Sequence, residues 1–404
     1  MAYLDRSLEP LARKAAREFP AVLLAGPRQS GKSTLLRHLF QETHRYVSLE
    51  SPEVRAAATD DPRSFLESNP PPVIIDEAWH APGLLPYIKE RIDKCGGKTG
   101  QYLLTGCRNL PFSGKITGSL GNRATILRLL PLSYREITKM PHANFPWEKG
   151  ARTGRHGFTY RDLWESFLKG GYPGIAAHPK QDVACWHANF VQSYLERDLR
   201  SLRQIGDLTQ FHRFFRALAA RSARLFNITD LARDLGLAVN TVKAWISVLE
   251  ASDQIFILRP YFREVGKRLV KTPKVYFADV GTLCYLAGLK DAGHAMSGPM
   301  GAAIFETAVV CEIMRRLSGR GERPHLYFWK TANGVEVDLI VETGGRLLPI
   351  EIRMSATPDR LMARNIASFQ KDFYGLAEKG YVVHPGDVTL PLGPGVVALP
   401  FADL

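Results

Sequence analysis

The chain has 404 residues, of which 45% are hydrophobic and 23% are charged. This balance excludes a disordered or fibrous chain, and the length exceeds one ordinary core, so we expect two or three domains. The 53 Lys and Arg outnumber the 40 Asp and Glu, giving a formal net charge of +13 that favours an anionic partner, most commonly nucleic acid.

The cysteines and the apolar runs indicate a cytoplasmic protein. The five cysteines are widely spaced and form no Cys-x-x-Cys pair, which is typical of reduced thiols and not of a disulfide framework or a metal knuckle. No apolar run approaches the roughly 18 residues of a membrane span, and the N-terminal stretch is too charged for a signal peptide. We therefore expect no membrane partner.

Apolar, strand-like runs alternate with helical stretches in the first third of the chain. The runs are AVLLAG, PPVIIDEA, QYLLTG and ATILRLLPL. This alternation predicts an α/β domain with a parallel sheet covered by helices. Residues 140–157 are rich in Pro, Gly and charge and lack apolar periodicity, so we expect a domain joint there and assign residues 1–150 to the first domain.

The loop after the first strand carries a phosphate-binding motif. Residues 26–33, GPRQSGKS, fit G-x-x-x-x-G-K-[ST] between an apolar strand and a helical run. Gly26 and Gly31 let the backbone curl around a phosphate, Lys32 would reach the β- and γ-phosphates, and the Ser33 hydroxyl would bind Mg²⁺. The alternative, a chance Gly-rich turn, fits the flanking elements less well. The motif predicts ATP and Mg²⁺ as cofactors, with the nucleotide bound by Gly26, Pro27, Arg28, Gln29, Ser30, Gly31, Lys32, Ser33 and Thr34.

Polar residues follow the next two strands. Asp76 and Glu77 end the VIID strand, where Asp76 can accept from the Mg²⁺ shell and Glu77 can act as general base on the attacking water. The plainer interpretation is that the two acids only cap a strand. After the strand QYLLTG, Thr105 or Asn109 lies where a sensor of the γ-phosphate would sit. Three arginines are candidate arginine fingers: Arg108, Arg123 and Arg128. Each of them could instead be an ordinary surface side chain.

Several blocks of the sequence resemble one family. GPRQSGKST, VIIDEAWHAPGLLPYIK, LLTGCRN, SLGNR and LLPLSYREI, followed by GGYPG, YLERDLRSL, GAAIFETAVV and GVEVDLIVE, resemble the bacterial and archaeal AAA+ ATPases that end in the domain DUF4143. The resemblance implies an AAA+ core, ATP bound with Mg²⁺, and a homo-oligomer, for which a hexamer is one of the expected assemblies. Cys107 stands where relatives have Ser, which favours Thr105 as sensor. The segment 119–123 keeps an arginine, which favours Arg123 as the finger.

The middle of the chain, residues 158–260, has long helical periods. Within it, residues 226–258 predict a helix capped by Thr229, a turn at Gly236, a second helix from near Asn240 and a strand, which is the layout of a winged helix-turn-helix. Residues 193–274 hold 15 Lys or Arg against 8 Asp or Glu. The unit either binds DNA or only packs within the chain. The residues expected to meet DNA are Asn240, Thr241, Lys243, Lys267 and Arg268, while Val242, Trp245, Ile246 and Leu249 should pack inward.

The last part, residues 261–404, mixes strands and helices, with LYFWK, VEVDLIVE and LLPIEIR as successive strands. Glu306 on a helix, Asp338 on a strand and Glu351 on the next strand follow the arrangement of PD-(D/E)XK nucleases, whose carboxylates hold Mg²⁺. DUF4143 itself resembles that α+β fold. Arg353 replaces the lysine of the pattern, and since arginine does not readily exchange protons, we expect a degenerate site more than an active nuclease.

Two functions remain open at this point. The first is an ATPase that couples turnover to binding or remodelling of duplex or branched DNA through the basic middle region. The second is a nucleotide-dependent protein switch, chaperone-like or antitoxin-like, without nucleic-acid contact and with a catalytically degenerate nuclease-like domain. Both use ATP. The positive charge favours the first, and the lack of an aromatic stacking series keeps the second open.

Overall fold

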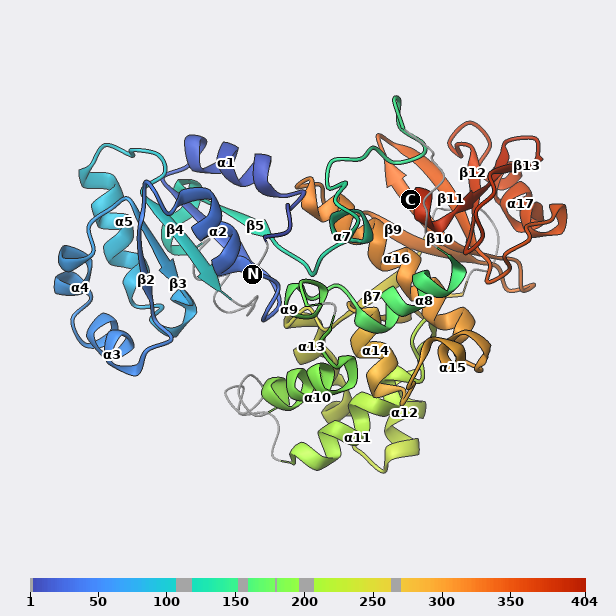
Figure 1. The fold of residues 1–404 in the computed structure, drawn as a ribbon, viewed down its shortest axis with the longest axis horizontal. Coiled ribbons are helices and arrows are strands. Elements are labelled where there is room, and N and C mark those ends of the chain that lie inside the picture. Colours follow the sequence, from blue (N-terminus) through green and yellow to red (C-terminus); the bar gives the residue numbers. More distant parts are fainter. Residues whose placement is uncertain (1–2, 107–117, 152–158, 179, 196–206, 263–269) are drawn as a thin grey trace.

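The computed structural model describes residues 3–106, 118–151, 159–178, 180–195, 207–262 and 270–404. Figure 1 shows three parts: a sheet-centred N-terminal part, a helical part, and a second sheet that contains the C-terminus. No helix within these ranges is long and apolar enough to cross a membrane. Four residues with predicted roles, Arg108, Asn109, Lys267 and Arg268, lie outside the described residues, as does Cys107.

The N-terminal part is built on a five-stranded sheet in the order β2-β3-β4-β1-β5. Every neighbouring pair is parallel, which confirms the predicted parallel sheet. Because parallel strands end at one edge, the carboxyl ends of β1, β3 and β4 are brought together there. The strands are β1 (Ala21–Ala25), β2 (Arg45–Ser48), β3 (Val73–Asp76), β4 (Tyr102–Gly106) and β5 (Ala124–Arg128).

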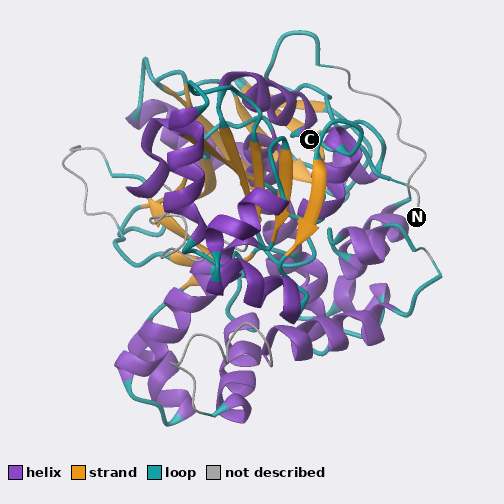
Figure 2. Ribbon diagram, turned by 90° about the vertical axis from the view of Figure 1, so that its left-hand side faces the viewer, coloured by secondary structure: helices purple, strands orange, loops and turns teal. Residues whose placement is uncertain are grey.

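Helices cover both faces of this sheet, and Figure 2 shows its strands between them. Alternate residues of β1 point to opposite faces: Leu23 joins one apolar core with Ile88, and Leu24 joins another with Leu36. Such two-sided burial explains the continuous apolar runs in the sequence. The helices are α1 (Glu9–Glu18), α2 (Lys32–Phe40), α3 (Pro52–Asp60), α4 (Pro62–Ser68) and α5 (Leu84–Lys94).

The segment that follows β5 leaves this sheet and packs on the C-terminal part. It contains the short helix α7 (Tyr134–Ile137), and the Tyr134 amide donates to the buried carboxylate of Glu312 on α16 (Gly301–Gly319) at 2.6 Å. Phe145 is fully buried, and the Arg316 guanidinium lies 3.9 Å from the centroid of its ring. The predicted first domain, 1–150, thus includes residues whose core contacts belong to the C-terminal part.

The middle part is helical, as predicted, with an aromatic core in which Trp245 contacts Phe211 and Phe214. The first helix of the predicted helix-turn-helix, α12 (Ile228–Leu235), ends at Gly236. The φ of Gly236 is +66°, which confirms the predicted turn. The predicted cap at Thr229 is wrong: Asn227 caps this helix, and its side chain accepts from the Thr229 amide. The helices are α8 (Tyr160–Lys169), α9 (Pro173–Ala176), α10 (Val183–Ser193), α11 (Leu208–Ala219), α12 (Ile228–Leu235) and α13 (Val239–Ala251).

A nine-stranded mixed sheet, ordered β13-β14-β12-β11-β10-β9-β7-β8-β6, organises the rest of the chain. The three predicted strands are confirmed as β9, β10 and β11. The strands that follow the helix-turn-helix, β7 and β8, pair antiparallel inside this sheet, so the predicted boundary at 260/261 separates two paired strands. The strands are β6 (Arg224–Leu225), β7 (Ile255–Pro260), β8 (Lys274–Phe277), β9 (Leu326–Lys330), β10 (Glu336–Thr343), β11 (Arg346–Ile352), β12 (Gly380–His384), β13 (Leu390–Gly393) and β14 (Val396–Pro400).

The helices associated with this sheet are led by α16, whose 19 residues are largely buried. Glu306, Glu312 and Arg315 all lie on it, so one helix carries both the nuclease-like acid and the residues that hold the segment after β5. The remaining helices are α14 (Val280–Leu286), α15 (Ala292–Ser297) and α17 (Arg364–Asp372).

Candidate functional site

The predicted phosphate loop connects the buried strand β1 to helix α2 and has a tightly constrained backbone. A Cβ at Gly26 would lie 2.1 Å from the carbonyl oxygen of Leu129, so only glycine fits this close approach. Gly31 precedes α2 with φ +91°, a conformation that favours glycine. The N-terminus of α2 therefore opens directly onto the loop, which suits it to an anionic group.

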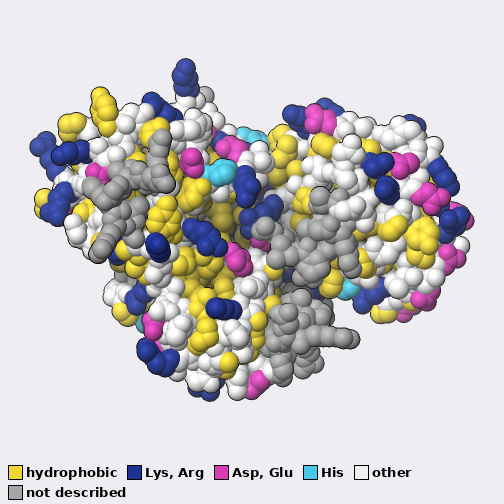
Figure 3. All heavy atoms as spheres, turned by 180° about the vertical axis from the view of Figure 1, so that it is seen from behind, with side chains coloured by type: hydrophobic (Ala, Val, Ile, Leu, Met, Phe, Trp, Pro, Cys, Tyr) yellow, Lys and Arg dark blue, Asp and Glu magenta, His cyan; other side chains and the backbone are white. Residues whose placement is uncertain are grey.

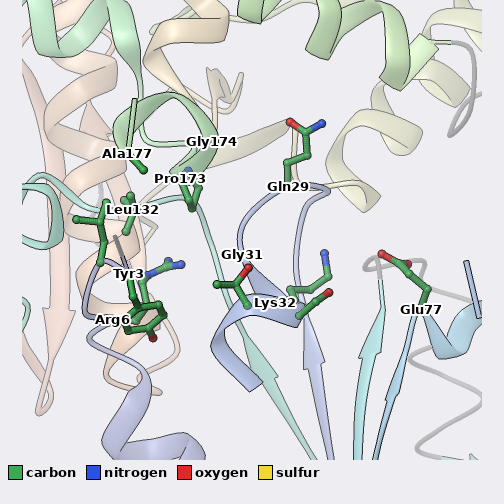
Figure 4. Close-up of a pocket in the computed structure, with 13 residues that line it drawn as sticks. Tyr3, Arg6, Gln29, Gly31, Lys32, Glu77, Leu132, Pro173, Gly174 and Ala177 are labelled. Atoms are coloured by element: carbon green, nitrogen blue, oxygen red, sulfur yellow. The ribbon is translucent and has the colours of Figure 1, made fainter. Parts of the chain in front are cut away.

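Lys32 lies inside the loop. It is 4% exposed, and its Nζ donates to the carbonyl oxygens of Gly26 at 3.2 Å and Pro27 at 2.9 Å. These bonds hold the ammonium between the loop backbone and the acidic end of β3, and Figure 4 shows Lys32 between Gly31 and Glu77. The position suits contact with a bound polyphosphate.

The carboxylate of Asp76, at the end of β3, accepts three hydroxyl groups. Ser33 Oγ donates to Oδ1 at 2.6 Å, Thr105 Oγ1 donates to the same oxygen at 2.5 Å, and Tyr46 OH donates to Oδ2 at 2.8 Å. Partial burial and the bond to Asp76 raise the pKa of Tyr46 to about 12, so the phenol stays a donor. The adjacent Ser33 and Asp76 oxygens are of the kind that Mg²⁺ prefers, so these residues fit the predicted ion.

Glu77 is held by its backbone and by its side chain. Its φ of +54° is unusual for a non-glycine residue, its amide donates to Thr105 Oγ1 at 2.9 Å, and its carboxylate accepts from the Trp79 indole. Thr105 is fully buried on β4, between β3 and β1, and does not line the cavity. Here its hydroxyl positions the two acidic residues.

A cavity of about 350 Å³ lies over the loop and takes its walls from three parts of the chain. Figure 4 shows Glu77 on one side of Lys32 and the N-terminal residues Tyr3 and Arg6 on the other. The N-terminal residues carry no motif, and the GGYPG block, which contains Pro173 and Gly174, had no role predicted for it at the nucleotide. The lining residues are Tyr3, Leu4, Arg6, Gln29, Gly31, Lys32, Ser33, Thr34, Glu77, Leu132, Pro173, Gly174 and Ala177.

Arg6 ties the cavity wall to the loop. Its guanidinium, 5% exposed, donates to the Ser30 carbonyl at 2.9 Å, to the Leu130 carbonyl at 2.6 Å and to the Glu136 carboxylate at 3.1 Å. Two other predicted loop residues are also placed by the structure. Ser30 is fully buried, and the Arg28 guanidinium lies 3.9 Å from the Glu50 carboxylate. A single N-terminal arginine thus fixes the outer turn of the loop.

The GGYPG segment joins this cavity to α16. The Leu132 amide donates to the Gly171 carbonyl at 2.6 Å, and Arg315 donates to the Leu132 carbonyl at 2.9 Å. Asp279 accepts from the Gly171 amide at 2.7 Å and from Arg315 at 3.1 Å. Since Leu132 lines the cavity, its wall is bonded directly to the helix that carries Glu306.

The two described finger candidates do not reach this cavity within one chain. Arg123 forms an ion pair with Asp93 on α5, and its side chain is 33% exposed. Arg128 pairs with the buried Asp253. Neither arginine lines the cavity, so a role for Arg123 at a nucleotide requires a second subunit.

Two of the three nuclease-like acids line a second cavity, of about 510 Å³. Glu306 and Asp338 line it together with Arg353, which lies 3.4 Å from Asp338 Oδ2 and 3.0 Å from Glu351 Oε2. Burial and the neighbouring Asp338 raise the pKa of Glu306 to about 7 and that of Glu351 to about 10. Lys274, for which no role was predicted, also places its ammonium in this cluster.

Three of the residues expected to meet DNA lie at the start of α13. At the start of α13, Asn240 and Lys243 are exposed and Thr241 is half-buried. On the opposite side of the helix, the four residues expected to pack inward are buried, which confirms that prediction; they are Val242, Trp245, Ile246 and Leu249.

Comparisons with known proteins agree with this organisation. Family models match residues 18–138 as an AAA domain, residues 160–293 as a domain of unknown function (DUF8612) and residues 301–404 as a domain of unknown function (DUF4143). The uncharacterized proteins Rv2008c of Mycobacterium tuberculosis and Mb2031c of Mycobacterium bovis are each 30% identical over 390 residues, which span 96% of this chain and 81% of theirs.

Two solved structures align with much of the chain. The Walker-type ATPase PABY2304 of Pyrococcus abyssi aligns at TM-score 0.45 and 15% identity, over 70% of this chain and 96% of that one. The RuvB Holliday junction branch migration motor of Thermotoga maritima aligns at TM-score 0.30 and 18% identity, over 62% and 87%. On its AAA and DUF4143 domains, and on relatives that cover nearly all of it, the chain belongs to the family of AAA-type P-loop ATPases with a C-terminal DUF4143 domain.

Proposed function

We propose that the N-terminal domain binds Mg·ATP in the cavity above the phosphate loop and hydrolyses it. The observation that carries this proposal is that Lys32 and Ser33 from the start of α2 and Glu77 after β3 line one cavity, with Asp76 at the end of β3 bonded to Ser33. Ser33 and Asp76 would hold Mg²⁺, which supplies charge neutralisation at the phosphates. Lys32 and the α2 N-terminus bind the phosphate oxygens.

The acidic side of the cavity would orient the attacking water. Glu77 accepts the water proton, while Trp79 and Thr105 hold its carboxylate and its amide in place. On the other side, the apolar wall of Tyr3, Leu132 and Pro173 suits a nucleobase. This arrangement separates binding, at Lys32, from catalysis, at Glu77.

In this proposal a neighbouring subunit completes the nucleotide site. The resemblance to AAA+ proteins favours a homo-oligomer, and Arg123 would enter the neighbouring nucleotide site as an arginine finger. Two observations support this assignment: Arg123 does not line its own cavity, and its partner Asp93 lies on an exposed helix surface, where an ion pair is cheaply exchanged.

Nucleotide binding is tested by Lys32→Ala. The variant lacks charged hydrogen bonds worth about 1.5–3 kcal/mol, so its affinity for a fluorescent ATP analogue should fall by about 10-fold to 150-fold. Lys14→Ala, which removes an exposed lysine from α1, serves as control and should bind normally. Equal affinities for the Lys32→Ala variant and the parent chain would refute the placement of the phosphates.

ATP turnover is coupled, in this proposal, to binding or remodelling of duplex or branched DNA. The support is the concentration of 15 Lys or Arg against 8 Asp or Glu in residues 193–274, with Asn240 and Lys243 exposed on α13. On the face drawn in Figure 3, basic side chains are spread over the surface and interspersed with acidic ones. Contact with phosphates, more than with bases, fits such a distribution.

One observation favours the alternative, a nucleotide-dependent protein switch without nucleic acid. Strands β7 and β8 follow α13 inside the nine-stranded sheet, and all four residues of β8 are buried. A helix-turn-helix attached in this way could serve mainly to transmit movement between the ATPase domain and the sheet. The two functions differ in whether the chain binds DNA at all.

Salt-dependent DNA binding distinguishes them. Replacing Lys243, Lys267 and Arg268 together with Glu should reduce the slope of log affinity against log salt by about 0.9 for each DNA phosphate that is no longer neutralised. Lys371→Glu, an exposed lysine on α17, is the control for charge alone. If the parent chain has no affinity for duplex, branched or single-stranded DNA at low salt, with or without ATP, the switch replaces the DNA-coupled function.

A further inference from the structure

We infer that the nuclease-like cluster of the C-terminal domain is filled by a cation of the chain itself, the ammonium of Lys274, and does not take a divalent metal ion. The PD-(D/E)XK arrangement of Glu306, Asp338 and Glu351 implies Mg²⁺ between carboxylates. The structure places a lysine nitrogen there instead, contributed by β8, a strand outside that three-residue pattern.

The contacts of Lys274 are those of a buried counter-ion. Its side chain is 4% exposed, and Nζ lies 2.7 Å from Glu336 Oε1, 2.9 Å from Glu306 Oε1 and 3.9 Å from Asp338 Oδ1. Tyr276, two residues along the same strand, also donates to Glu306 Oε1, at 2.6 Å. Successive inward residues of β8 thus serve the acid on α16.

The oxygens of Asp338 and Glu336 are also engaged, whereas the buried carboxyl of Glu351 has the Arg353 ion pair and, among the described residues, no hydrogen bond. Asp338 Oδ2 accepts from the Ile352 amide at 2.9 Å and lies 3.4 Å from Arg353, which also approaches Glu351. Lys330 donates to the second oxygen of Glu336 at 2.6 Å. Three cationic side chains, Lys274, Lys330 and Arg353, therefore face four carboxyl groups.

A metal ion between Glu306 and Asp338 would compete with Lys274 for the same carboxylate oxygens. A Mg²⁺ ion sits about 2.0–2.1 Å from its oxygen ligands, so an ion bridging Glu306 Oε1 and Asp338 Oδ1, the oxygens nearest to Nζ, would press against the ammonium. At such separations the repulsion between a divalent ion and an ammonium is large in a poorly solvated site. The residues do not fit the ion that the nuclease pattern implies, and the cluster instead links β8, α16 and β10.

The test measures Mn²⁺ bound to the full chain, from the loss of the free-ion signal in electron paramagnetic resonance. Asp76→Asn serves as the background, because it removes a proposed metal ligand of the ATPase site. In that background we expect no Mn²⁺ whose binding depends on Glu306. Adding Lys274→Ala should create about one Mn²⁺ site per chain, because the carboxylates then lack their ammonium. Lys330→Ala, which removes a lysine from the cavity edge, should not.

Two results would overturn the inference. The first is that the Asp76→Asn chain binds one Mn²⁺ and that the double variant Asp76→Asn, Glu306→Gln does not. This result would show that a metal ion and Lys274 coexist in the cluster. The second is a Lys274→Ala chain that is folded by circular dichroism and gains no Mn²⁺ site. If Lys274→Ala does not fold, Mn²⁺ binding by the Asp76→Asn chain with and without Glu306→Gln still tests the inference, because both of these chains retain Lys274.

Discussion

Thr105→Val is the change that best isolates how the acidic side of the ATPase site is built. Valine has nearly the same shape, so the change removes one hydroxyl that donates to Asp76 and accepts from the Glu77 amide. A hydrogen bond to a charged group is worth about 1.5–3 kcal/mol, and an unsatisfied buried amide costs about 1–3 kcal/mol. Because Asp76 keeps its bonds to Ser33 and Tyr46, we expect a stability loss of about 2–4 kcal/mol.

The effect on turnover should exceed the effect on nucleotide affinity. A displacement of Glu77 by about 1 Å can cost 100-fold, so we expect kcat to fall by about 10-fold to 100-fold. The affinity for ATP should change less than about threefold, since Lys32 and Ser33 keep their positions. Urea unfolding, steady-state hydrolysis and titration with a fluorescent nucleotide measure the three quantities separately.

Thr105→Ser is the matched control, because it retains the hydroxyl and should recover most of the missing kcat. The reasoning is refuted if Thr105→Val hydrolyses ATP at the parent rate. It is also refuted if the variant loses ATP affinity while kcat stays unchanged, since that pattern would mean direct contact between Thr105 and the nucleotide.

The remaining predictions concern the subunit interface and the packing after β5. Arg123→Ala should keep nucleotide binding and lose turnover. Mixing this variant with Glu77→Gln chains should partly restore hydrolysis in assembled oligomers, because some interfaces then hold an intact base and an intact finger. No recovery in the mixture would count against a shared site. Phe145→Ala should lower the unfolding free energy by about 3–5 kcal/mol, because it removes the buried ring under Arg316, with ATP affinity unchanged. An unfolding midpoint equal to that of the parent chain would contradict this packing account.

The ATPase side of the molecule could be predicted because its signals are local in the sequence. The loop at residues 26–33 and the pair Asp76-Glu77 each adjoin a continuous apolar run, and parallel strands bring such ends to one edge. No local pattern marks Arg6, which reaches the loop carbonyl of Ser30 across 24 residues of sequence. Contacts of this kind depend on how elements pack, which a single sequence does not reveal.

The C-terminal part shows the same limit more strongly. The acids Glu306, Asp338 and Glu351 could be placed from a strand and helix pattern, yet Lys274 reaches Glu306 across 32 residues of sequence and had no signal of its own. The domain joint expected at 140–157 rests on Pro and Gly content, whereas Phe145 packs under Arg316, far along the chain. Composition marks where a chain turns more readily than where its core contacts lie.

The hydrolysis rate of the Glu77→Gln variant, measured together with its ATP affinity, tests the central claim most directly. The amide keeps the size of the side chain but cannot take a proton, so we predict unchanged ATP affinity and hydrolysis slower by at least about 100-fold. Hydrolysis by Glu77→Gln at the rate of the parent chain would contradict the assignment of the catalytic base and the site built around it.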